Sequence, residues 1–120
     1  MEKNRTEQLE ALNTLAEFNG RLVKNLPTIV SELSGNRQPD TDTYLKNMID
    51  AINWEIEVVN ATLDVINEGE TRIDKEDFNQ KILALSSALT SNIDSKIAAA
   101  LQDLTPLFQQ LGNAVKEVIL

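Results

Sequence analysis

The side chains of this sequence that could do chemistry are mainly carboxylates. The chain holds 19 Asp and Glu residues but no histidine and no cysteine. The commonest general base, the thiol nucleophile and the usual transition-metal ligands are therefore missing. A site built from carboxylates alone would favour a hard cation such as calcium or magnesium. The densest group of acids runs from Glu68 to Asp77.

This acidic segment is better explained by helix chemistry than by a metal site. A calcium loop of the EF-hand type needs oxygen ligands at alternating positions, a central glycine and a final glutamate, and the segment lacks that spacing. Asp74, Glu76 and Asp77 are typical of a helix start, where acids face the positive end of the helix dipole. No phosphate-binding glycine loop or nucleophile elbow occurs either. The sequence predicts no metal, no cofactor and no enzymatic activity.

The net charge narrows the choice of partner. It is −8, and the three acids after Asp77 are balanced by three lysines, so the whole excess lies in residues 1–77. Phosphate backbones and anionic lipid surfaces repel such a chain, and no basic stripe offsets the repulsion. We expect no nucleic acid and no membrane as partner. The polar first ten residues and the lack of a long apolar run predict a cytoplasmic protein.

The elements that must position any site are helices. Strong turn signals occur at only two places, residues 34–40 and 67–71, and the stretches between them repeat apolar residues every three or four positions. We expect an all-α, antiparallel up-down bundle of three long helices, formed by residues 4–33, 42–68 and 75–104. A helix or helical extension over 106–119 follows a kink at Pro106, and residues 1–120 form a single domain.

The first predicted helix carries one polar residue on its apolar ladder, Asn19. The ladder consists of Leu9, Leu12, Ala16, Asn19, Val23, Leu26, Val30 and Leu33. Its alternating steps of three and four are typical of a helix packed against near-parallel neighbours. Pro27 should kink or break this helix, because proline lacks the backbone N–H. Asn19 is interpreted as a register-fixing core residue rather than a catalytic one.

The second predicted helix is apolar on two faces. Asp40 or Thr41 can cap it and Gly69 can stop it. Its main ladder is Leu45, Ile49, Ile52, Ile56, Val59, Leu63 and Ile66, which is free of acids. A second stripe, pointing roughly the other way, consists of Ala51, Trp54, Val58, Ala61 and Val65. That stripe is either covered by another helix of the same chain or available to a partner.

The third predicted helix begins with a clear local signal. Asp74 is a good N-cap, and Ile73 and Phe78 stand at the positions of a hydrophobic staple. Its ladder passes through Ile93, where two successive steps of four should locally unwind the supercoil. An unbroken helix from residue 75 to residue 119 would extend past the end of the second helix by roughly 17 residues, at 1.5 Å each. The overhang would begin near Pro106.

Two apolar surfaces are therefore candidates for partner binding. One is the second stripe, centred on the only tryptophan of the chain, a residue enriched at interface hot spots. The other is the C-terminal segment, which is either a fourth core helix or a docking arm. The residues predicted to bind a partner are Trp54, Val58, Ala61, Val65, Leu107, Phe108, Leu111, Val115 and Val118.

These features together favour a non-enzymatic protein–protein interaction module. A small, acidic, all-helical, cysteine-free chain with an apolar C-terminal segment is similar in general character to bacterial export chaperones, including flagellar ones. That resemblance implies a chaperone or adaptor that shields a helical segment of a client protein. The alternative is a structural protein that self-associates through the same faces, for example as a homodimer.

Overall fold

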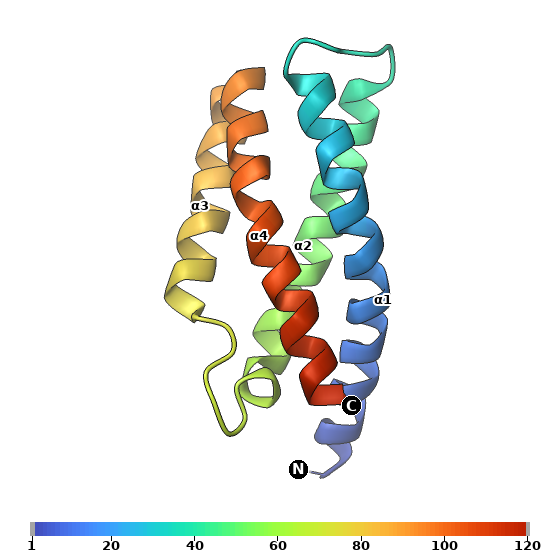
Figure 1. The fold of residues 1–120 in the computed structure, drawn as a ribbon, viewed down its shortest axis with the longest axis vertical. Coiled ribbons are helices and arrows are strands. Elements are labelled where there is room, and N and C mark those ends of the chain that lie inside the picture. The colour runs from blue at the N-terminus through green and yellow to red at the C-terminus, as the bar shows by residue number, and fades with distance from the viewer. Residues whose placement is uncertain (1, 120) are drawn as a thin grey trace.

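The computed structural model describes residues 2–119, with side chains from Arg5 onward, and every regular element in it is a helix. Its four helices are α1 (Glu2–Leu33), α2 (Thr41–Ile66), α3 (Lys75–Ser91) and α4 (Asp94–Ile119). The molecule measures 48 × 24 × 19 Å. In Figure 1, α1 and α3 run upward and α2 and α4 run downward, so each connection reverses the chain. None of the described helices is long and apolar enough to cross a membrane.

The core lies mainly between the first and last helices. The contact between α1 and α4 is the most extensive one, α2 packs chiefly on α1, and α3 approaches no other helix than α4. One cluster of buried side chains nevertheless joins all four helices. The two innermost helices are thus α1 and α4, while α2 and α3 flank them (Figure 1).

The helix ends follow the local sequence in most places. The side chain of Asp74 accepts hydrogen bonds from the backbone N–H groups of Glu76 and Asp77, as a capping aspartate should. Ile73 and Phe78 are both buried beside it. Asp40 occupies the N-cap position of α2 without a side-chain cap bond. Thr41 instead accepts from Gln38 N–H at 2.7 Å.

The third and fourth helices divide at a different place from the one the sequence suggested. The structure ends α3 at Ser91 and begins α4 at Asp94, rather than breaking the helix near Pro106. Asn92 adopts the left-handed conformation, with φ 56°, and this residue reverses the chain. Ile93, placed on the core ladder from its spacing, is 44% exposed in this short link. The irregular spacing around Ile93 marked a chain reversal, not an unwound supercoil.

The two helix prolines are tolerated where they stand. Pro27 lies within α1 and Pro106 within α4, and both are exposed. Each removes one backbone hydrogen bond without burying an unpaired group, since the ring lies on the water-facing side. Both helices therefore continue past their proline. Instead of projecting past the other helices, α4 packs along α1.

Candidate functional site

The inward face of α2 contains a glutamate. The residues that α2 buries most deeply on this face are Met48, Ile52, Glu55, Val59, Thr62 and Ile66, and their steps alternate between four and three. Ile52, Val59 and Ile66 of the main ladder belong to this face, but its remaining members are Met48, Glu55 and Thr62, which the ladder read from the sequence did not include. The expectation that the ladders carry no acid is therefore wrong for α2.

Glu55 is fully buried, and neither carboxylate oxygen has a hydrogen-bond partner among the described residues. Burial raises the pKa of Glu55 from 4.5 to about 8, because the low-dielectric interior disfavours the charged form. The side chain is consequently mostly protonated at neutral pH. The sequence signal for it was the regular spacing of Ile52, Glu55, Val59 and Thr62, which was hidden by the apolar residues on both sides.

Asn19 is the second polar side chain in the interior, as its place on the α1 ladder indicated. Its Nδ2 donates to the backbone oxygen of Phe108 at 2.9 Å, which joins α1 to α4. Its Oδ1 has no hydrogen-bond partner in the part of the chain that the structure describes. Gly112 makes room for this amide, because a Cβ there would lie 2.7 Å from Nδ2.

Asn19 and Glu55 lie at a similar height along the bundle. Each directly follows an aromatic residue, Phe18 on α1 and Trp54 on α2, and these two rings have centroids 5.1 Å apart. The rings sit at the edge of the α1–α2 seam, whereas Asn19 and Glu55 are turned inward and buried. No hydrogen bond joins the two buried groups, so this arrangement does not form an acid–base pair.

The C-terminal segment belongs to the core. Leu107, Phe108, Leu111 and Val115 are all buried, and Val118 is half-buried. Phe108 also meets Phe78 of α3 edge to face, at a ring-centroid distance of 6.3 Å. Of the two alternatives for residues 106–119, the structure favours the core helix. A partner could reach the buried members of this set only by displacing α1 or α3. Residue 120 lies outside the described residues.

The tryptophan stripe is only partly open to solvent. Trp54 and Val58 are half-buried, Ala61 is exposed and Val65 is buried. Trp54 packs against Phe18, and so the stripe forms the edge of the seam between α1 and α2. Its accessible part is continuous with a depression next to Phe18.

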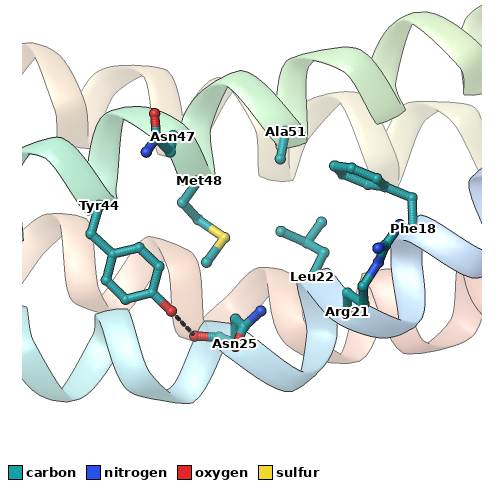
Figure 2. Close-up of a pocket in the computed structure, with 8 residues that line it drawn as sticks. All are labelled: Phe18, Arg21, Leu22, Asn25, Tyr44, Asn47, Met48 and Ala51. Carbon is teal, nitrogen blue, oxygen red and sulfur yellow. Dashed lines mark hydrogen bonds between the residues drawn. The ribbon is translucent and has the colours of Figure 1, made fainter.

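That depression, called here the α1–α2 groove, is a surface pocket formed between the two helices beside Phe18. It has a volume of about 290 Å³ and is lined by Phe18, Arg21, Leu22, Asn25, Tyr44, Asn47, Met48 and Ala51. Figure 2 shows Leu22 and Met48 pointing toward each other across it, with Tyr44 and Phe18 at its two ends. Sequence reasoning missed this groove because its lining comes from two helices whose relative register the sequence did not specify.

The two ends of the groove differ in polarity. Tyr44 Oη donates to the backbone oxygen of Asn25 at 3.4 Å, linking α2 to α1 (Figure 2). Burial, with a further contribution from Glu32, raises the pKa of Tyr44. At the other end the guanidinium of Arg21 lies over the Phe18 ring, 5.6 Å from its centroid. This geometry is that of a cation–π contact.

The acidic segment from Glu68 to Asp77 is organised around an arginine. Arg72 Nη1 donates to the backbone oxygens of Ile66 and Glu68, at 2.9 and 2.8 Å. Its other nitrogens lie near the carboxylates of Glu70 and Glu117. Within the described part of the chain no group of three or more Asp and Glu residues could hold a metal ion. The arginine ties the end of α2 to α4.

Comparison with known proteins identifies a family but no characterised relative. Residues 10–114 match the model of DUF8042, a domain of unknown function. No curated protein matches the sequence. No solved structure matches it either.

Proposed function

We propose that this chain, which belongs to the DUF8042 family, is a non-catalytic protein-interaction module that binds a client segment in the α1–α2 groove. The observation that carries the proposal is the groove itself. It places two aromatic residues, a methionine and an arginine around an open apolar depression. Aromatic residues, methionine and arginine are the side chains enriched at protein interfaces.

A larger depression on the described surface lies beside Leu83, but lysine, glutamate and amide side chains form the rest of its lining, whereas the α1–α2 groove is lined by two aromatic rings. Only two large apolar side chains of the described residues are exposed, Leu83 and Ile93, and each stands on or next to α3 rather than beside the groove. A contiguous apolar depression is a better marker of binding than single exposed apolar residues. The half-buried Trp54 extends the apolar surface from Phe18 along α2.

A helical client segment fits this proposal. A groove between two helices can accept the apolar face of a third, with one or two anchor side chains entering the depression. We take the four helices to form an antiparallel up-down bundle that holds the groove in place. The acidic surface would discourage nucleic acid and anionic membranes and leave proteins as partners. This client-shielding role is the one that the likeness to export chaperones implied.

The test compares two matched substitutions on α2. Asn47 is exposed and lines the groove, whereas Asn60 is exposed on the same helix and does not. Asn47→Arg should block the depression and reduce recovery of a co-purifying partner by about tenfold, a loss of 1.4 kcal/mol. Asn60→Arg should leave recovery unchanged. Equal recovery with both variants would contradict a role for the groove.

Trp54→Ala gives a second measurement on the same surface. We expect weaker partner binding with largely preserved helical content in circular dichroism. Loss of helical content would instead assign Trp54 to the core. Light scattering of the purified protein separates the remaining alternative. A stable homo-oligomer that Asn47→Arg dissociates, with no foreign partner recovered, would make the groove a self-interface.

A further inference from the structure

We infer that the α1–α2 groove recognises a peptide segment that carries an apolar side chain next to a carboxylate, with Arg21 as the carboxylate's partner. The inference rests on the proposed function and adds the chemistry of the client. It comes from the pairing of the arginines, the lining of the groove and the charge of the chain.

The arginines of this chain differ in whether they form ion pairs. Among the described residues, Arg5 pairs with Glu68, Arg37 with Asp42 and Asp94, and Arg72 with Glu70 and Glu117. Arg21, the fourth arginine, forms no ion pair with any described residue, although acids outnumber bases 19 to 11 in the chain. It rests over Phe18 instead, at the mouth of the groove. Its donors therefore remain free for an incoming anion.

The floor of the α1–α2 groove is apolar. Leu22, Met48 and Ala51 supply an apolar surface, and Arg21 is the only charged residue among the eight that line the groove. A volume of about 290 Å³ is near the lower end of the range for ligand pockets and accommodates one large apolar side chain. Methionine adapts to varied side-chain shapes, so the floor suits a class of residues rather than one residue.

The rim of the α1–α2 groove carries two amide side chains. Asn25 and Asn47 are exposed on opposite helices, and each carries both a donor and an acceptor. Side-chain amides on both sides of an apolar slot can pair with polar side chains of a bound helix and with the backbone N–H or C=O groups left unpaired at its end. This polar lining suits a peptide better than a lipid tail, which offers no backbone groups to pair.

The charge distribution commits the inference to a single carboxylate rather than a polyanion. One guanidinium can form a bidentate pair with one carboxylate. A nucleic acid or an anionic membrane would bring many negative charges against a chain of net charge −8. The partner is therefore a peptide in which one acidic group lies within reach of the anchor side chain.

The experiment uses 3-phenylpropionate as the probe and its neutral amide, 3-phenylpropanamide, as the matched control. Both are titrated into the full chain and followed by NMR. The single tryptophan is a built-in reporter, because Trp54 contacts Phe18 of the groove. We expect saturable shifts at Met48 and Trp54, with affinity on the order of millimolar for so small a ligand. The carboxylate should bind about threefold to tenfold more tightly than the amide.

Three variants locate the effect. Arg21→Gln should remove the preference for the carboxylate, and Arg21→Lys should retain part of it. Lys24→Gln removes an equal charge from an exposed position of α1 outside the groove, and should leave the preference intact. A preference lost equally in Lys24→Gln would reduce the effect to net charge and overturn the inference.

The remaining outcomes separate this inference from the function on which it rests. Equal binding of the acid and the amide at the groove would overturn the carboxylate site while leaving a protein-binding groove in place. No shift at Met48 or Trp54 with either probe would overturn the inference as well. The proposed function fails separately, if Asn47→Arg and Asn60→Arg recover the same partner equally.

Discussion

Asn19 and Glu55 are buried polar residues at a similar height in the molecule, and they differ in the hydrogen-bond partners that their surroundings offer. At the α1–α4 interface, Asn19 finds a backbone acceptor on α4 and a glycine that leaves it space. On α2, Glu55 finds no partner for either oxygen. A buried amide that donates to the backbone of a neighbouring helix specifies how the two helices pack, whereas a buried carboxyl without any hydrogen bond destabilises the helix that carries it.

The helices differ in what they contribute to packing and to the candidate binding surface. The α1–α4 pair forms the most extensive helix contact and includes a polar contact that fixes its register. The α2 helix supplies half of the residues that line the groove, and one turn beyond Ala51 it buries the unpaired acid Glu55. Binding surfaces are often drawn from the less stable part of a fold, because adapting to a partner requires some freedom.

The largest expected effect tests the packing side of this comparison. Leu111 of α4 is fully buried and Leu63 of α2 is half-buried, so the same truncation can be made in both helices. Leu111→Ala should lower the free energy of unfolding by about 3–5 kcal/mol, because it leaves a cavity in a close-packed site. Leu63→Ala should cost about 1–2 kcal/mol, since less apolar surface is lost. Similar losses in urea denaturation would show that α2 contributes as much packing as α4.

The next-largest expected effect is the pH dependence of folding stability that the unpaired acid Glu55 produces. The folded-state pKa of Glu55 is about 8, above the 4.5 of the unfolded chain. Between these values the folded state holds the extra proton, so stability is fully present below pH 4.5 and falls as the pH rises toward 8. The slope from this group is about 1.4 kcal/mol per pH unit.

Glu55→Gln isolates that contribution, because the amide has nearly the same shape and does not titrate. The variant should match the parent near pH 4 and exceed it by about 4 kcal/mol at pH 8. Thermal or urea unfolding at a series of pH values measures the difference, in which the other titrating groups cancel. A difference that stays constant across pH would mean that Glu55 is paired or hydrated in solution.

The smallest effect tests how tightly Asn19 is held. Gly112→Ala places a methyl group against the Asn19 amide and should cost about 1 kcal/mol, despite the better helix propensity of alanine. Gly20 is a matched control, because it is helical and has open space around it. Gly20→Ala should gain about 0.5–1 kcal/mol.

A double-mutant cycle completes this test. In an Asn19→Ala background the clash at Gly112 disappears, so Gly112→Ala should become neutral or stabilising there. A cost that is unchanged in that background would place the strain somewhere other than the Asn19 side chain.

Local chemistry was readable from the sequence, and tertiary arrangement was not. The cap at Asp74, its staple partners Ile73 and Phe78, and the buried position of Asn19 follow from neighbours within one or two turns of helix. The chain reversal at Asn92 was missed, because asparagine in a left-handed conformation is a weaker signal than the proline at 106. Glu55 was missed because apolar residues surround it on the wheel of α2.

The candidate site shows the same limit. Trp54 was recognised from its place on the second apolar stripe and as the single tryptophan, but the groove depends on which residues of α1 stand opposite which residues of α2. That register is set by contacts such as Phe18 with Trp54 and Tyr44 with Asn25. No periodicity within a single helix contains that information.

The dominance of the α1–α4 contact has a consequence for biosynthesis. Of the four helices, α1 is translated first and α4 last, so the principal interface joins the two helices that leave the ribosome furthest apart in time. Until α4 emerges, the inner face of α1 has only α2 to cover it. We therefore expect the nascent chain to stay incompletely folded through most of its synthesis and to depend on chaperones or rapid completion during that interval.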